Sequence, residues 1–180
     1  LDNARLYEDS VSRATELDSR SQRLTALNRF TSGLTGLLDA EQILNLTADE
    51  LLKALSVQRV SIVTFERGRA YWRVASPRLK IKFPRLLPDS PIFNRLRESL
   101  GIFNTNDVRN EPDLASLLEI LHENTSALLI LPLISGQNLT GLVFAQMTGE
   151  ERFGSNEIEV SLTITNQSTI ALENARLYQS

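Results

Sequence analysis

Two apolar runs separated by four turn-forming residues constrain the fold of this chain more than any other feature. Residues 127–134 and 139–147 are rich in Leu, Ile, Val and Phe, and the intervening SGQN supplies Gly and Asn for a tight turn. Strands joined by so short a turn must be antiparallel, because a parallel connection needs a dozen or more residues. Residues 60–66 and 69–76 repeat this arrangement across Arg67-Gly68. The sequence therefore predicts an antiparallel sheet that contains two hairpins.

Helical patterns separate and flank these strands. Asp39 is a good N-cap for a helix that ends near Ser56. Pro in the first turn predicts two short helices, one from Pro91 to a C-cap at Gly101 and one that begins at Pro112. Three further elements are expected: a short strand or extended loop at 79–83, a short strand within 101–108, and a closing helix capped by Ser155.

This order of elements predicts an α+β fold. We expect a central antiparallel sheet of five to six strands, with long N- and C-terminal helices on one face. Short helices and loops from the middle of the sequence would cover a pocket on the other face. With 180 residues, of which 42% are hydrophobic, the chain can build a sizeable core.

The two ends of the chain carry nearly the same sequence. Residues 1–7 (LDNARLY) and residues 172–178 (LENARLY) are identical at six of seven positions, with Asp in one where the other has Glu. The offset of 171 residues is about one domain, so we interpret the chain as one period of a domain array. The alternative is a coincidence between two exposed helices rich in Ala, Arg and Leu.

Residues 1–38 show a heptad pattern. Leu17, Leu24, Thr31 and Leu38 fall seven apart, with Leu27 and Leu34 at the intervening core spacing. A single polar helix of this kind needs a partner, most simply a second copy of itself. The alternative is a frayed linker.

Three segments taken together resemble the GAF domain. They are LLDAEQILNLTADELLKALSVQRVSIVTFE, SALLILPLISGQNLTGLVFAQ and ERFGSNEIEVSLTITNQSTIALENARLY, and the match spans roughly residues 24–178. The resemblance implies a sensory module of tandem-GAF signalling proteins such as bacterial sensor histidine kinases. It also implies long helices that dimerise and a ligand held between the sheet and the middle helices. The expected division is a linker or signalling helix at 1–38, a GAF core at 39–156, and at 157–180 a helix leading to the next domain.

Candidate ligand-binding residues follow from this resemblance. They combine aromatic and polar side chains of the predicted pocket: Phe65, Trp72, Phe83, Phe93, Phe103, Asn104, Asp107, His122 and Ser126. As an alternative, the bulky aromatics fill the pocket and leave a ligand-free structural module.

Several specific ligands and reactions find little support in the residues. His122-Glu123 resembles a phosphoacceptor motif, but Thr125 stands one position too early, and we expect His122 to make a helix-end contact. Phe153 and Glu157 could match the end of a cyclic-nucleotide motif, but Asn156 replaces its Asp and the upstream Asn-Lys pair is missing. The chain has no Cys, which excludes covalent bilin attachment, and one His is weak support for haem.

A basic stripe with interleaved aromatic residues lies in the first half of the chain. Alternation along a strand would turn one set of its side chains toward water, whereas contact with an anionic ligand or with nucleic acid are the alternatives. The stripe contains no acidic residue and consists of Arg67, Arg69, Arg73, Arg78, Lys80, Lys82 and Arg85.

These observations predict a sensory and dimerisation domain of a multidomain signal-transduction protein. It would bind a small molecule or relay a signal through parallel terminal helices, and would not be an enzyme by itself. The expected partners are a second copy, adjacent GAF or output domains and a small-molecule ligand of unknown identity. Nucleic acid is not expected with a net charge of −3, and the apolar runs are too short to insert into a membrane. The expected location is the cytoplasm.

Overall fold

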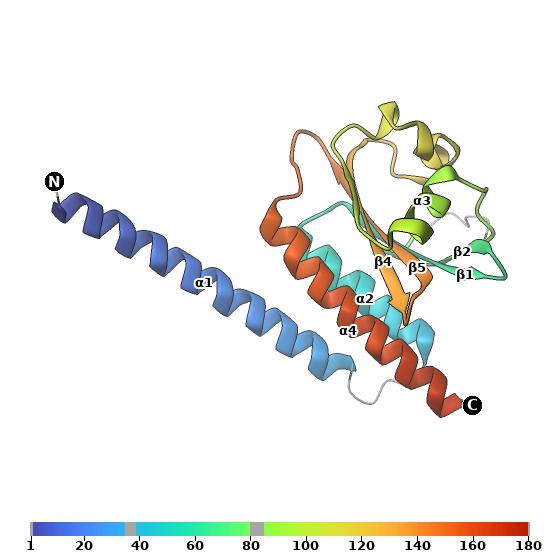
Figure 1. Ribbon diagram of the computed structural model, residues 1–180, viewed down its shortest axis with the longest axis horizontal. Coiled ribbons are helices and arrows are strands. Elements are labelled where there is room, and N and C mark those ends of the chain that lie inside the picture. The colour runs from blue at the N-terminus through green and yellow to red at the C-terminus, as the bar shows by residue number, and fades with distance from the viewer. Residues whose placement is uncertain (1, 35–38, 80–84, 180) are drawn as a thin grey trace.

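One five-stranded antiparallel sheet organises the chain (Figure 1). The computed structural model describes residues 2–34, 39–79 and 85–179. The strand order is β2-β1-β5-β4-β3, and every neighbouring pair is antiparallel. The strands are β1 (Arg59–Glu66), β2 (Arg69–Ser76), β3 (Phe103–Thr105), β4 (Thr125–Ser135) and β5 (Asn138–Thr148).

Both predicted hairpins are confirmed. Arg67 and Gly68 join β1 to β2 with φ values of 50° and 78°, a left-handed conformation that Gly adopts without steric cost. The short strand expected within 101–108 is β3. Of the extended segment expected at 79–83, Leu79 is not in a strand, and the other residues lie outside those described.

Helices α2 (Ala40–Leu55) and α4 (Ser155–Gln179) cover one face of the sheet. Helix α2 contacts β1 and β2, whereas α4 contacts β4. Asp39 caps α2 as expected, and its carboxylate accepts a hydrogen bond from the N–H of Glu41 at 2.9 Å. Ile43 and Leu51 are fully buried on the inner side of α2. The apolar stripe of α2 thus fixes this helix on the sheet.

The other face of the sheet carries shorter elements: α3 (Pro91–Ser99), η1 (Val108–Asn110) and η2 (Pro112–Ile120). The helix predicted from Pro112 is present but is a 3₁₀-helix, which needs tighter turns than the α form. The C-cap predicted at Gly101 is wrong by one residue, because Leu100 adopts the left-handed conformation and donates its N–H to the carbonyl of Leu96. Ser155, predicted as a cap, is already the first residue of α4.

Helix α1 (Asp2–Leu34) is a 33-residue rod whose residues 2–18 are all exposed and which meets α2 and α4 from Ser19 onward. Long terminal helices do lie on one side of the sheet as predicted. It is α2, however, and not α1, that lies on the sheet beside α4, and α1 packs against these two helices. Figure 1 shows α1 and α4 running in the same direction, with the two ends of the chain far apart. No helix in the described part of the chain is long and apolar enough to cross a bilayer.

Candidate functional site

Apolar side chains fill the layer between the sheet and the middle helices. Phe93 is buried on α3, and Phe65 meets it edge to face, with ring centroids 5.5 Å apart and ring planes at 80°. Phe103 is buried on β3, where the guanidinium of Arg95 lies 5.2 Å from its ring centroid. Further buried members of this layer are Val63, Leu114, Leu117, Leu128, Ile130 and Phe144. Three of the predicted ligand residues thus come together, as part of a packed layer.

The predicted polar ligand residues lie elsewhere. Asn104 is exposed on β3, and Asp107 is exposed at the start of η1, where its carboxylate accepts a hydrogen bond from the Asn110 amide at 2.5 Å. Ser126 donates to the backbone carbonyl of Met147 at 3.2 Å and joins the strands β4 and β5. The structure does not gather these side chains around one cavity with the aromatic residues.

His122 lies in the turn before β4. Its backbone N–H donates to Oε1 of the buried Gln146 at 2.7 Å, and its Nδ1 accepts from the N–H of Asn124 at 3.4 Å. Since η2 ends at Ile120, the imidazole stabilises the turn that follows the helix instead of the last helical turn itself. The described contacts of His122 therefore stabilise this turn.

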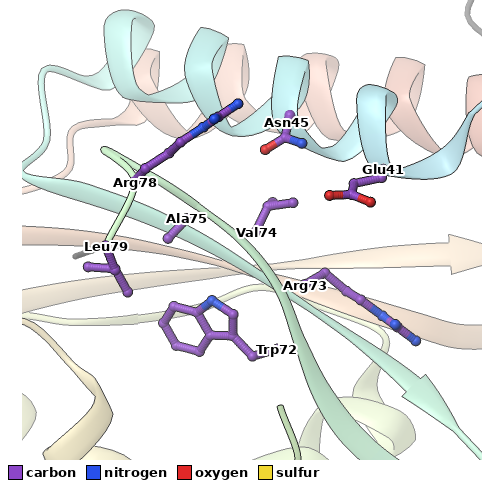
Figure 2. Close-up of a pocket in the computed structure, with 8 residues that line it drawn as sticks. All are labelled: Glu41, Asn45, Trp72, Arg73, Val74, Ala75, Arg78 and Leu79. Atoms are coloured by element: carbon purple, nitrogen blue, oxygen red, sulfur yellow. The ribbon is translucent and has the colours of Figure 1, made fainter. Parts of the chain in front are cut away.

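A polar groove lies between α2 and β2, and we call it the β2–α2 groove (Figure 2). It encloses about 390 Å³. Figure 2 shows Glu41 and Asn45 projecting from α2 toward the strand, with Arg73 and Arg78 at either end and Trp72 below. An adjoining hollow of about 540 Å³ shares Glu41, Trp72 and Arg73. Of the predicted ligand residues that the structure describes, Trp72 lines both hollows and Phe65 lines the second, whereas Phe83 lies outside the described residues.

Arg73 is already engaged by neighbouring side chains. Its Nε donates to Oγ1 of Thr64 at 2.6 Å, and its terminal nitrogen forms an ion pair with Glu66. The guanidinium also lies 5.7 Å from the ring centroid of Tyr71. This part of the basic stripe is held by intramolecular contacts, and the Arg73 side chain is otherwise exposed to water.

A second groove lies on the other side of β2, next to α3, and we call it the β2–α3 groove. It encloses about 370 Å³, and its walls come from the β1–β2 turn, residues 87–89 and α3. Arg69 and Arg97 face it, together with Asn94, Phe93 and Asp89. Arg97 donates to the carbonyl of Gly68 at 3.2 Å and to Oδ1 of Asn94 at 2.9 Å. Its carbon Cζ lies 4.5 Å from the ring centroid of Phe65.

The described residues contain no group of three His, Cys, Asp or Glu side chains that could hold a metal ion. The charged side chain with a shifted pKa is Arg59 at the start of β1, where burial lowers the pKa of the guanidinium. Arginine keeps its charge at neutral pH despite such a shift, so Arg59 is no candidate for acid–base chemistry.

The terminal helices expose a second kind of surface, made of apolar side chains. On α1 and α4 the large exposed apolar residues are Leu6, Tyr7, Val11, Leu17, Leu24, Ile170, Leu177 and Tyr178. Arg23 fixes α1 to the beginning of α4, because its guanidinium donates to Asn156 at 2.7 Å and to Glu159 at 3.0 Å. The exposed apolar positions therefore fall on both sides of the segment where α1 and α4 meet.

Comparison with known families identifies the chain. The profile of the GAF domain matches residues 39–172. The chain belongs to the GAF family. This confirms the resemblance seen in the sequence, and GAF domains are sensory modules of signalling proteins. No curated protein matches the sequence.

Solved GAF domains share the fold at low sequence identity. A GAF domain of a phosphoenolpyruvate-protein phosphotransferase from Coxiella burnetii superposes with a TM-score of 0.72 at 19% identity, covering 87% of this chain and 96% of that one. A GAF domain of a two-component sensor histidine kinase from Bacillus halodurans gives 0.67 at 13%, covering 80% and 100%. Free methionine-R-sulfoxide reductase from Neisseria meningitidis, solved with its substrate, gives 0.71 at 15%, covering 87% and 91%. At these identities the likeness establishes the fold alone.

Two features of this GAF chain were missed by sequence reasoning. The pairing of Arg23 with Asn156 joins residues 133 positions apart, and no local pattern indicates it. Arg69 was counted in the basic stripe, but its proximity to Arg97 on α3 depends on how α3 packs beside the β1–β2 turn. Only the tertiary structure brings these pairs together.

Proposed function

We propose that this GAF chain is a dimerising module that couples helix α1 to helix α4 within a multidomain signalling protein. The family match supports a signalling role, and solved neighbours include domains from a sensor histidine kinase and from a methyl-accepting chemotaxis protein. The observation that carries the proposal is the apolar surface of the terminal helices.

On α1, Leu17 and Leu24 are 65% and 60% exposed and lie seven residues apart, so they face the same side of the helix. Residues 2–18 of α1 are all exposed, because the contacts of this helix with the domain begin at Ser19 (Figure 1). A helix that is largely polar and unsupported is not stable in water unless its apolar side chains are covered. A second copy of α1 would cover them.

The exposed positions of α4 extend this arrangement to the other end of the molecule. Ile170 and Leu177 are 51% and 68% exposed and again lie seven residues apart. Leu177 corresponds to Leu6 in the repeated heptapeptide, and Leu6 is separated from Leu27 and Leu34 by multiples of seven. Leu6 and Leu177 are 65% and 68% exposed, whereas Leu27 is half-buried and Leu34 is buried where α1 meets the domain. In a parallel dimer, the exposed apolar residues of α1 would pack against those of the second α1, and the exposed apolar residues of α4 against those of the second α4.

The contacts between α1 and the domain provide a path from one helix to the other. Arg23 joins α1 to the first turns of α4, and Arg29 forms an ion pair with the buried Glu50 of α2 at 2.8 Å. Deeper in the same layer, the fully buried hydroxyl groups of Thr47 and Ser168 lie 2.7 Å apart and link α2 to α4. A change in the packing of α1 would act on α4 through these contacts.

The packed layer beside α3 supports the version of this function in which no ligand occupies that layer. The set of residues predicted to bind a ligand there stays a proposal. A coupling role through the helices requires only the contacts described above.

The association is tested by sedimentation equilibrium and by cysteine cross-linking. We expect the chain to be dimeric at micromolar concentration and the double variant Leu17→Lys/Leu24→Lys to be monomeric, because both lysines would face the seam. Ser12→Lys changes an exposed residue of α1 away from the seam and should leave the dimer intact. Since the chain has no Cys, a single Leu17→Cys variant should cross-link to itself if the helices are parallel and in register. A wild-type chain that stays monomeric at high concentration would refute the proposal.

A further inference from the structure

We propose that the β2–α3 groove binds a small molecule carrying an oxyanion, a phosphate ester or a carboxylate, through Arg69 and Arg97. The proposal does not depend on dimerisation, because the groove is formed within one chain. The groove adjoins the packed layer in which the ligand was first expected and shares Phe93 with it, but Arg69 and Arg97 were not among the predicted ligand residues.

Arg97 is held in position before any ligand arrives. Its two terminal nitrogens donate to Gly68 and Asn94, and its planar head lies over the ring of Phe65. Both hydrogen-bond acceptors are neutral, and these bonds leave further N–H groups of the guanidinium available. A guanidinium fixed by its surroundings loses little conformational entropy when it binds a carboxylate or a phosphate with two parallel hydrogen bonds.

The charges of Arg69 and Arg97 are not neutralised by a partner. No described carboxylate forms an ion pair with either of them, although Arg95 on the same helix pairs with Asp113. Arg69 is exposed at the start of β2 and lines the groove together with Arg97. Two guanidinium groups that line one hollow, beside a single carboxylate that pairs with neither, attract an anion and exclude a second cation.

The other residues that line the groove indicate the chemistry of the rest of the ligand. Asp89 is the one acidic residue among the described lining residues, and its Oδ1 accepts the backbone N–H of Ser90 at 3.0 Å. It would repel a bare phosphate but accept a hydrogen bond from a hydroxyl or an amine. Leu87, Pro88 and Phe93 supply apolar surface. A volume of about 370 Å³ suits a small molecule, so a phosphorylated sugar or a hydroxy acid fits better than a polymer.

Titration calorimetry of the full chain with four probes tests the site. The probes are ribose 5-phosphate, inorganic phosphate, succinate and neutral ribose. We expect ribose 5-phosphate to bind and ribose to show no heat. Binding of phosphate or of succinate then identifies which oxyanion the arginines prefer. If none of the three anions binds, the proposal is wrong.

Variants assign the binding to the groove. Arg69→Gln should lower the affinity of the bound anion about tenfold or more, and because Arg69 is exposed this variant is expected to fold normally. Arg97→Lys keeps the charge but loses the planar fork and should also weaken binding. Arg109→Gln removes an exposed arginine from η1, outside the groove, and serves as the matched control. Asp89→Asn should strengthen the binding of inorganic phosphate. Equal affinities for wild type, Arg69→Gln and Arg109→Gln would overturn the proposal.

Discussion

Phe30 and Leu34 are buried where α1 meets the domain, and removal of the more deeply buried Phe30 shows whether α1 is coupled to the rest of the chain. Phe30 is 1% exposed and packs into the core that α2 and α4 form on the sheet, whereas its helical neighbours Asn28 and Arg29 are exposed. The change from Phe30 to Ala would cost about 3–5 kcal/mol if the surrounding structure kept its shape around a cavity. The end of α1 can instead leave the domain, which limits the loss to the burial energy of the side chain, about 1.5–3 kcal/mol.

We therefore expect Phe30→Ala to release the end of α1 while the sheet stays folded. A loss of about 2–3 kcal/mol corresponds to an increase of roughly 30- to 150-fold in the opening equilibrium of α1. Hydrogen exchange measured by mass spectrometry reports this directly, because peptides from residues 24–34 should exchange faster and peptides from the buried core of β5 should not.

The control for this experiment is Asn28→Ala, which changes an exposed residue two positions away on the same helix. It should leave exchange in α1 unaltered. Two outcomes contradict the reasoning. If β5 loses as much protection as α1, the end of α1 is part of the cooperative core. If α1 shows no change, Phe30 is not its anchor.

Two further predictions concern the core. A Cβ at Gly141 would lie 2.6 Å from the backbone carbonyl oxygen of Val63, so Gly141→Ala should lower the free energy of unfolding by about 1–3 kcal/mol in urea denaturation. The control is Gly154→Ala, which should lower it less, because its Cβ would meet only the flexible end of a glutamate at 2.6 Å. A larger loss for Gly154→Ala than for Gly141→Ala would show that the strand adjusts freely. Thr47→Val removes the hydroxyl that lies 2.7 Å from Ser168 and should lower stability by about 1 kcal/mol in the same assay, whereas a variant more stable than wild type would show that this buried polar pair is unfavourable.

The sheet was predictable because its information is local. Turn residues and apolar runs stand next to each other in the sequence, and short turns admit only antiparallel pairing. The middle segment, residues 91–120, was less predictable. Residues Pro112–Ile120 carry leucines at helical spacing, and packing against the sheet selects a 3₁₀-helix there, which periodicity does not distinguish from an α-helix. At the end of α3, Gly101 had the residue type of a C-cap, but the helix ends one residue earlier at Leu100.

The candidate site was harder to predict for a physical reason. An aromatic residue that lines a ligand pocket and one that fills a core obey the same preference for leaving water. Phe93 and Phe103 satisfy it by packing in the buried layer between the sheet and the middle helices. The sequence alone does not indicate whether such a residue fills a core or lines a pocket. The basic stripe posed a similar ambiguity. Both Arg73 and Arg69 belong to β2, but Arg73 forms an ion pair with Glu66 on the adjacent strand, whereas Arg69 lines a groove.

The end of β1 connects the two faces of the domain. Successive residues of a strand point to opposite faces. Phe65 accordingly supports Arg97 in the β2–α3 groove, while Thr64 and Glu66 hold Arg73 at the β2–α2 groove beside α2. An anion bound to Arg97 would change the contact of its guanidinium with Phe65 and, through the neighbours of Phe65 on β1, the position of Arg73. Because α2 packs against both α1 and α4, this path would end at the helices that we propose to dimerise.

Thermodynamic reciprocity makes this path testable with the variants already described. If an anion in the groove changes the dimerisation constant by some factor, dimerisation must change the affinity for that anion by the same factor. The variant Leu17→Lys/Leu24→Lys, designed to be monomeric, leaves every residue of the groove in place, so a difference between its affinity for ribose 5-phosphate and that of the wild type measures the coupling. We expect a difference of about fivefold or more, the range typical of allosteric sites. Equal affinities would mean that groove and helices work independently, because a ligand shifts an equilibrium only by its difference in affinity for the two states.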